Sequence, residues 1–345
     1  MKAAVYHGPP GSWPKKAMTM EEVPVPEPGP KDVLVKVAAC GLCHTDLTYL
    51  HGAPMPKEPP IILGHEPSGI VAKVGAEVKD IKPGQRVMIS TTIPCLTCNF
   101  CRHGQENLCL NTTVVGATQN GAFAEYVVAP AIGVYLLPDS LPLEESCIIS
   151  DAVCTAYHAV YQVANVRPGD TVAIYGASGG VGLLCVRLAS AIGADVVGIG
   201  RKKWKLEKAR EFGATEIISS EEVQPFDKAV RRATGGGADI SIDATGVPEM
   251  IETACRSARP GGKIVVVSLT FQKFQIEINR LTWSELKVMG SRTFNPVDIP
   301  KVFKLVEKGV IDLNRIISHR FKLEEINQAY EMLDRGELLR GIVIP

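Results

Sequence analysis

The sequence lacks long apolar runs, and it lacks a net charge. No stretch approaches the roughly 20 apolar residues of a membrane-spanning helix, and residues 1–18 have no apolar core of the kind found in secretory signals. Lys and Arg together number 37, as do Asp and Glu, so the formal net charge is zero. Nucleic acids and anionic membranes both attract basic surfaces, so neither is expected as the main partner. The expected compartment is therefore the cytoplasm.

Ten cysteines are present without an export signal that would favour disulfides. Four of them lie within 15 residues, in the pattern Cys95-x2-Cys98-x2-Cys101-x7-Cys109. In a reducing compartment such a cluster more often binds metal. Four thiolates close the tetrahedral shell of zinc and leave no position for substrate, so the spacing predicts a structural zinc. Reduced surface cysteines and a nucleic-acid-binding zinc ribbon are the weaker alternatives.

The composition of the chain and the secondary structure that it predicts change near Asp151. Its 345 residues are 46% apolar and 21% charged, which predicts a globular protein with two domains. Eleven of the 24 prolines fall in the first 60 residues, among short β-branched runs such as 33–37 and 68–74, which predicts an irregular β-rich domain. Beyond Asp151, strands and helices alternate, which predicts a parallel α/β sheet.

A glycine-rich turn follows the predicted strand 171–175 and opens a predicted helix at 181–192. Its glycines have the spacing G-x-x-G-x-x-G, from Gly176 to Gly182. They permit a tight turn and a close approach of a pyrophosphate to the helix N-terminus, so the turn predicts a dinucleotide site. A glycine-rich turn without a ligand is the weaker alternative.

The residue after the next predicted strand, 195–199, bears on the choice of cofactor. An NAD enzyme usually carries Asp or Glu there to hold the ribose 2′-hydroxyl. Here Gly200 is followed by Arg201-Lys202-Lys203. Because guanidinium pairs bidentately with phosphate, this favours NADP(H) over NAD(H). A solvated basic start of a helix is the alternative.

Three further motifs occur in order: Cys40-Gly41-Leu42-Cys43-His44-Thr45-Asp46, Gly64-His65-Glu66-x2-Gly69-x-Val71-x2-Val74-Gly75 and Gly84-x-Arg86-Val87. With the four-cysteine lobe, they resemble the zinc-containing medium-chain dehydrogenases/reductases over essentially the whole chain. The resemblance is greatest to the tetrameric alcohol dehydrogenases of the yeast and bacterial type. By residue type alone, a lone cysteine is usually a small core residue and a lone histidine more often bonds a carbonyl.

The resemblance implies an α/β protein of two domains. A GroES-like β-rich catalytic domain would span residues 1–151 and 293–345, and a Rossmann doubly wound parallel sheet residues 152–292. It implies a zinc-dependent oxidoreductase that transfers a hydride between a small alcohol and a nicotinamide cofactor, with the aldehyde or ketone as substrate in reverse. It also implies two zinc ions per subunit, one catalytic and one structural, and a homotetramer or homodimer.

Carried over by position, Cys43, His65 and Asp151 match ligands of the catalytic zinc, and Glu66 matches a carboxylate that can join them. Many members have a cysteine where Asp151 stands. Carboxylate oxygen is also an ordinary zinc ligand, and Cys154 is the alternative. A catalytic zinc keeps one open position, where an alcohol would bind with its pKa lowered toward neutrality.

The remaining implied roles concern protons and the cofactor. Asp46 would accept the far N–H of His65 and so fix its tautomer. Thr45 matches the hydroxyl that touches the alcohol oxygen, but Thr48 stands near the place where many members carry a relay histidine, so His51 or His44 is the alternative. The implied cofactor contacts are His44, Thr155, Gly176, Gly179, Gly180, Val181, Gly182, Gly200, Arg201, Lys205, Thr245, Val267, Leu269, Ser291, Thr293 and Arg340.

Two functional alternatives stay open. The first is a family member that binds NADPH without turnover, against which the intact ligand set and Thr45 argue. The second is an NAD-dependent dehydrogenase of a specialised alcohol, such as a sugar or an acyl-CoA alcohol, because the sequence does not reveal the substrate.

Overall fold

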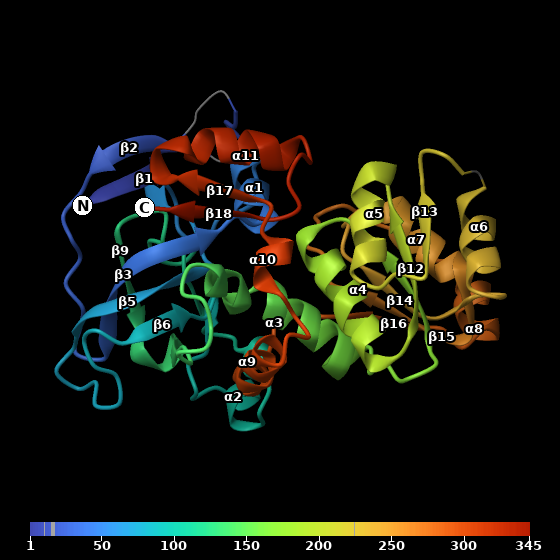
Figure 1. The fold of residues 1–345 in the computed structure, drawn as a ribbon, viewed down its shortest axis with the longest axis horizontal. Coiled ribbons are helices and arrows are strands. Elements are labelled where there is room, and N and C mark those ends of the chain that lie inside the picture. The colour runs from blue at the N-terminus through green and yellow to red at the C-terminus, as the bar shows by residue number, and fades with distance from the viewer. Residues whose placement is uncertain (10, 15–17, 224) are drawn as a thin grey trace. The chain divides into compact units, whose positions relative to one another are not determined.

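A computed structural model describes residues 1–9, 11–14, 18–223 and 225–345 (Figure 1). The chain folds into two compact units. Unit 1 consists of Met1–Asp151, Asn295–Glu307 and Asp312–Pro345, and unit 2 of Ala152–Phe294 and Lys308–Ile311. Residues 293–294 and 308–311, expected in the first domain, thus fall in unit 2. For 308–311 the reason is visible, because Arg187 Nε donates a hydrogen bond of 2.6 Å to the Val310 carbonyl.

Unit 1 is built mainly from β-strands. Its largest sheet has the order β10-β6-β5-β3-β18-β17, with β9 also paired to β3. These strands are β3 (Asp32–Gly41), β5 (Pro67–Val74), β6 (Arg86–Ile89), β9 (Tyr126–Pro130), β10 (Val134–Leu136), β17 (His319–Lys322) and β18 (Gly341–Ile344). The end of the chain therefore returns to the strand that leads into Cys43, as the red and blue strands of Figure 1 show.

Two smaller sheets and several short helices complete unit 1. The sheets are β2-β1-β4 and β7-β8. Their strands are β1 (Lys2–Tyr6), β2 (Thr19–Glu22), β4 (Ile61–Ile62), β7 (Thr92–Ile93) and β8 (Thr113–Val114). The helices are α1 (His44–Leu50), α2 (Asn99–Arg102), α9 (Ile299–Glu307), α10 (Leu313–Ile316) and α11 (Ile326–Asp334), with short 3-10 turns η1 (Glu106–Leu108), η2 (Ala131–Gly133), η3 (Glu145–Ser150), η5 (Pro296–Asp298) and η6 (Leu323–Glu325).

Unit 2 has one parallel sheet of six strands in the order β13-β12-β11-β14-β15-β16. The order reverses beside β11, as in doubly wound dinucleotide-binding sheets. The strands are β11 (Thr171–Tyr175), β12 (Asp195–Gly200), β13 (Glu216–Ser219), β14 (Ala238–Asp243), β15 (Ala258–Val266) and β16 (Lys287–Gly290). The helices are α3 (Ala152–Tyr157) with the π-helical turn η4 (His158–Val163), α4 (Gly180–Ile192), α5 (Lys203–Glu211), α6 (Phe226–Ala233), α7 (Pro248–Ser257) and α8 (Ile278–Trp283).

These elements follow from the local pattern of apolar residues. The strand β11, Thr-Val-Ala-Ile-Tyr, is buried at its last four positions, as a strand covered on both faces must be. The helix α4 is apolar along most of its length and ends at Gly193, whose φ of 97° suits a left-handed C-terminal cap. The expected α/β fold class is confirmed. Among the described residues, no helix is both long and apolar enough to cross a membrane.

Candidate functional site

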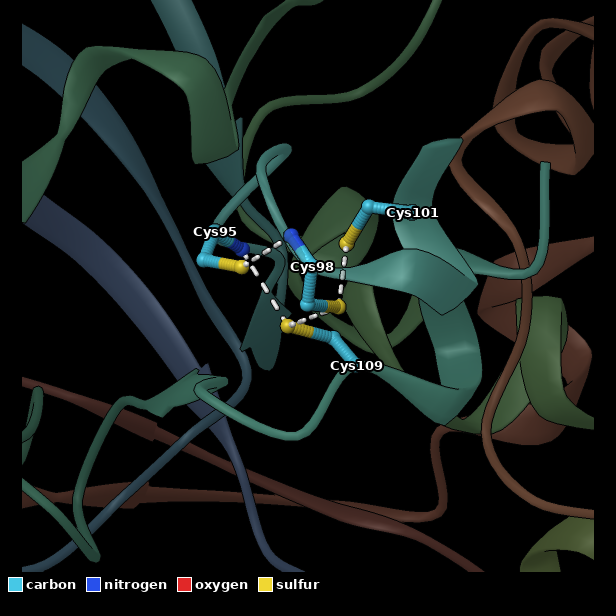
Figure 2. Close-up of side chains that lie close together, drawn as sticks. All are labelled: Cys95, Cys98, Cys101 and Cys109. Atoms are coloured by element: carbon cyan, nitrogen blue, oxygen red, sulfur yellow. Dashed lines mark hydrogen bonds between the residues drawn. The ribbon is translucent and has the colours of Figure 1, made fainter. Parts of the chain in front are cut away.

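Four cysteine side chains converge in unit 1, on the loop that follows β7. Figure 2 shows Cys98 next to both Cys101 and Cys109, and the sulfur–sulfur distances are 3.5 Å and 3.9 Å. All four sulfurs lie within 4.8 Å of one another. Zinc–sulfur bonds of about 2.3 Å in a tetrahedron place sulfurs roughly 3.8 Å apart. The lobe therefore has the donor set and the spacing of a closed zinc site.

Hydrogen bonds prepare one of these sulfurs to be a thiolate. The Thr97 hydroxyl donates to Cys95 Sγ at 3.4 Å and the Cys98 backbone N–H donates to it at 3.4 Å. Mainly through Thr97, these donors lower the pKa of Cys95 to about 5. Burial, followed by the Cys98 side chain, raises the pKa of Cys101 to about 12. A cation in the lobe would replace the proton that the Cys101 thiol holds.

A second group of ligand types meets elsewhere in unit 1. Donor atoms of Cys43, His65, Glu66 and Asp151 all lie within 4.8 Å of one another. Asp151 Oδ2 lies 3.4 Å from His65 Nε2 and 3.9 Å from Cys43 Sγ. Ligand atoms around zinc are typically about 3.3–3.8 Å apart. Within the described part of the chain this group contains Asp151 and not Cys154, the alternative third ligand.

The charge pattern of this second group suits a cation. His65 Nε2 is buried and has no hydrogen-bond partner among the residues that the structure describes. Burial by itself would lower the pKa of His65, but the Asp46 carboxylate and the Cys43 thiol raise it well above its usual value. A buried nitrogen that faces sulfur and carboxylate at ligand distances fits a zinc ion, so Cys43, His65 and Asp151 could hold one.

Asp46 contacts the second ring nitrogen of His65, Nδ1. It is fully buried at the start of α1, and its Oδ1 lies 3.0 Å from His65 Nδ1. Its Oδ2 accepts a hydrogen bond of 2.8 Å from the Tyr330 hydroxyl, which comes from α11. With Nδ1 occupied in this way, Nε2 is left for the ligand group.

Glu66 and Arg340 form a buried ion pair beside the ligand group. Arg340 donates to Glu66 Oε1, and both side chains are at most 5% exposed. Glu66 Oε2 has no hydrogen-bond partner among the described residues. Gly41 leaves the necessary room, because a Cβ there would lie 2.0 Å from Glu66 Oε2. The structure thus gives Arg340 a partner that the sequence did not indicate, while its implied contact with the pyrophosphate stays a prediction.

The residues considered for proton transfer lie around α1. Cys43 Sγ is 3.6 Å from the Thr45 hydroxyl oxygen. The Thr48 hydroxyl donates to the His44 carbonyl at 2.8 Å, four residues earlier in the same helix. His51 Nε2 lies 3.2 Å from Asp334 Oδ2, and its side chain is 47% exposed.

The turn between β11 and α4 requires glycine because there is no room for a side chain. A Cβ on Gly182 would lie 2.1 Å from the Gly176 carbonyl oxygen, and Gly176 itself has a φ of 82°. The turn therefore packs tightly against the first turn of α4, as a pyrophosphate-binding turn must. Gly179 is the N-cap of α4, and Gly180, Val181 and Gly182 form its first turn. The N–H groups in the first turn of an α-helix have no partner within the helix, which is typical of an anion site.

Several other implied cofactor contacts lie at the carboxyl ends of the strands of unit 2. The hydroxyls of Ser291 and Thr293, after β16, are buried without a hydrogen-bond partner among the described residues, as hydroxyls that bind a polar ligand would be. Asp243 ends β14 and accepts hydrogen bonds from the Thr245 backbone and hydroxyl, and from Ser268. Asp243 therefore organises the loop that carries Thr245. Val267 and Leu269 follow β15, Thr155 lies in α3, and Lys205 in α5.

Known proteins match the chain along nearly its full length. Residues 29–139 match the alcohol dehydrogenase GroES-like domain, and residues 180–308 match the zinc-binding dehydrogenase domain. An alcohol dehydrogenase of Schizosaccharomyces pombe is 36% identical over 312 residues, which cover 90% of this chain and 88% of that one. D-xylulose reductase A of Aspergillus niger is 33% identical over 333 residues, which cover 94% and 92%.

The chain belongs to the zinc-dependent medium-chain alcohol dehydrogenases. It is therefore an oxidoreductase that acts on alcohols with a nicotinamide cofactor, and the expected family and enzyme class are confirmed. A solved structure from Sinorhizobium meliloti 1021, described as a zinc-binding dehydrogenase bound to NADP, is similar to this dehydrogenase with a TM-score of 0.88 and 34% identity. The match covers 100% of this chain and 99% of that one.

Tyr330 is a residue beside the ligand group that the sequence did not indicate. Tyr330 lies 284 positions from Asp46, and nothing in the local pattern of α11 distinguishes it from a core tyrosine. The Asp243 carboxylate accepts hydrogen bonds from four donor groups, and two of these are the backbone N–H groups of Thr245 and Gly246, so it caps the turn after β14. Its place between a buried strand and Thr-Gly is the local sequence signal for such a cap.

Proposed function

We propose that this dehydrogenase interconverts an alcohol and its aldehyde or ketone with NADP(H), at a zinc ion held by Cys43, His65 and Asp151. The observation that carries the proposal is the buried His65 Nε2, which has no hydrogen-bond partner among the described residues and lies 3.4 Å from Asp151 Oδ2. In the oxidation direction, the alcohol loses a hydride to the cofactor and a proton to the protein. The products are the carbonyl compound, reduced cofactor and a proton.

Different side chains orient the zinc ligand, accept the proton and give the substrate access. When bound, the zinc supplies Lewis acidity that lowers the pKa of an alcohol hydroxyl. Asp46 keeps the His65 ring in one tautomer and orientation through the 3.0 Å contact to Nδ1. Thr45, whose hydroxyl lies 3.6 Å from Cys43 Sγ, accepts the alcohol proton while it passes its own hydroxyl proton to the next group of the relay. Cys43 and Asp151 are partly exposed, so substrate can reach this side of the group.

Asp46→Asn is expected to lower kcat/KM about 10- to 100-fold, because the amide is a weaker acceptor for the His65 N–H. The same change should weaken retention of one zinc ion. Steady-state kinetics and zinc analysis measure both effects. Asp298→Asn is a matched control, since Asp298 is equally buried and caps η5 away from the ligand group. Activity and zinc retention in Asp46→Asn equal to those of the control would contradict this role.

The proton path beyond Thr45 is proposed to use His51. In alcohol oxidation, His51→Gln should lower kcat about tenfold at low pH and less at high pH, where hydroxide replaces the missing base. His7→Gln is the control, because His7 is another exposed histidine of unit 1 paired with a carboxylate, Glu21. The measurement is the pH profile of kcat. A profile unchanged by His51→Gln would eliminate His51 and leave His44 as the alternative.

The preference for NADP(H) rests on the end of β12. Gly200 carries no acid for the ribose 2′-hydroxyl, and Arg201 next to it is exposed. The similar Sinorhizobium meliloti structure is bound to NADP, which supports the same choice. A guanidinium at this place would pair with the 2′-phosphate.

Arg201→Ser is therefore expected to lower kcat/KM for NADPH by roughly 10- to 100-fold, since a hydrogen-bonded charge contributes about 1.5–3 kcal/mol. The value for NADH should change little. Lys203→Ser is the control, because it removes one positive charge whose ammonium already lies 3.5 Å from Glu222. A higher kcat/KM of wild-type protein for NADH than for NADPH would contradict the proposed preference.

The substrate is best sought with a panel of primary, secondary, sugar and acyl-CoA alcohols, each tested with both cofactors. Sugar alcohols belong in the panel because the relative from Aspergillus niger is named a D-xylulose reductase. Turnover with one class identifies the substrate. NADPH binding without turnover anywhere in the panel would favour the alternative of a binding protein.

We also expect a homo-oligomer that works in the cytoplasm. Unit 2 exposes Phe271, Ile278 and Trp283, each at least 65% exposed, and β16 is an edge strand of its sheet. Exposed apolar side chains and an unpaired strand edge are each typical of a contact between protein chains. All ten cysteines are free thiols, which suits a reducing compartment.

A further inference from the structure

Within the part of the chain that the structure describes, the buried hydroxyl of Tyr330 makes one hydrogen bond. It donates to Asp46 Oδ2 at 2.8 Å, while Asp46 Oδ1 contacts His65 Nδ1 at 3.0 Å. Tyr330 and Asp46 are both fully buried. The contacts form a continuous line, Tyr330–Asp46–His65, whose far end is the nitrogen that faces Cys43 and Asp151.

Asp46 depends on this hydroxyl for its orientation. Of the residues that the structure describes, Tyr330 is the one donor to Oδ2. Oδ1 accepts from His65, and the Gly64 backbone N–H adds a long contact of 3.5 Å. A buried carboxylate oxygen without a donor is costly. Loss of the hydroxyl would therefore leave Asp46 without the contact that fixes its rotation toward the imidazole.

Two aromatic rings fix Tyr330 itself. Trp13 and Phe123 pack edge-on against its ring, with centroids 6.3 Å and 5.9 Å away. Phe123 also packs against the backbone just before His65, because a Cβ on Gly64 would lie 2.9 Å from the Phe123 ring. The same rings thus hold the hydroxyl and the segment that carries His65, as a support for precise ligand placement would require.

We propose that Tyr330 is a positioning residue for the catalytic metal, acting through Asp46 to hold His65 Nε2 in the ligand geometry. This inference rests on the proposed function, in which His65 binds the catalytic zinc. It assigns a role in metal retention to a residue of the C-terminal helix α11, which contributes no ligand.

The first test compares Tyr330→Phe with wild-type protein in the transfer of zinc to a chromogenic chelator. Tyr330→Phe keeps the ring and its contacts with Trp13 and Phe123. One zinc ion should be released about three- to tenfold faster than from wild-type protein, and the release rate of the other should not change. This effect is at or below the lower end of the effect expected for a residue that contacts a metal ligand directly. After cobalt substitution, the visible bands of the faster-exchanging site should shift. Tyr6→Phe is the control, since its buried ring also loses a hydroxyl, one that donates to the Pro9 carbonyl at 2.6 Å.

The second test asks whether Tyr330 acts through Asp46. The double variant Asp46→Asn/Tyr330→Phe should release zinc no faster than Asp46→Asn alone, because the shared contact is already weakened. Additive effects, release from Tyr330→Phe as slow as from wild type, or a Tyr330→Phe protein that does not fold would each overturn the proposal. Failure of the proposed function looks different, because wild-type protein would then hold a single zinc or stay active without the one that leaves first.

Discussion

Asp151→Ala is expected to remove one zinc ion and to lower kcat/KM for alcohol oxidation by at least about a thousandfold. A Lewis-acidic ion contributes several kcal/mol of charge stabilisation, and each 1.36 kcal/mol is a factor of ten. Asp151 Oδ2 lies 3.4 Å from His65 Nε2 and 3.9 Å from Cys43 Sγ, so its loss opens the ligand group to solvent. Zinc analysis and steady-state kinetics of the purified variant measure both effects.

Two further variants test whether the effect comes from the Asp151 carboxylate as a ligand. Cys154→Ala removes the alternative thiol ligand from the helix that follows Asp151, and it should keep both zinc ions. Asp151→Cys supplies a thiolate at a position where many members of the family have one, so it should retain zinc and recover part of the activity. Loss of zinc from Cys154→Ala, with zinc retained in Asp151→Ala, would assign the third ligand to Cys154.

Cys109→Ser is expected to remove the other zinc ion and to lower the thermal midpoint by about 10 °C or more. Zinc bound by four thiolates stabilises folded over unfolded protein by several kcal/mol, and in a domain of this size each kcal/mol shifts the midpoint by about 2–4 °C. Cys109 is 2% exposed and lies 3.9 Å from Cys98 Sγ, so a hydroxyl there cannot replace the thiolate. The measurements are zinc content and a thermal unfolding scan.

Cys255→Ser is the matched control for the lobe. Cys255 is also 2% exposed, but it lies in α7, outside both ligand groups. It should keep two zinc ions and unfold close to the wild-type temperature. A Cys109→Ser protein with the full zinc content, or one no less stable than this control, would contradict a structural zinc in the lobe.

Local pattern alone predicted the strands and turns whose residues specify them directly. The strand predicted at 171–175 has these bounds in the structure, because it is a short run of mainly apolar residues before a glycine turn, and the strand predicted at 195–199 extends one residue further, to Gly200. The strand β15, in contrast, begins at Ala258, five residues before the run of residues 263–266 that favours a strand locally. Its first five residues include Pro260 and two glycines, which disfavour a strand by propensity. Pairing with β14 at Ala238 holds them in place.

Tertiary contacts explain what the sequence could not. Gly41 belongs to a motif recognised from its order, yet the reason for glycine there is the Glu66 carboxylate, which occupies the space of a Cβ. Tyr330 reaches Asp46 only because β18 returns the end of the chain to β3 and brings α11 with it. Contacts between residues so far apart in the chain leave no trace in local periodicity.

Zinc stoichiometry measured alongside activity tests the central claim most directly. Purified, active protein should contain two zinc ions per chain, and a chelator that removes one of them should abolish alcohol-dependent reduction of NADP⁺, which added zinc then restores. One zinc ion per active chain, or full activity after the chelator has removed one of two zinc ions, would contradict a metal centre at Cys43, His65 and Asp151.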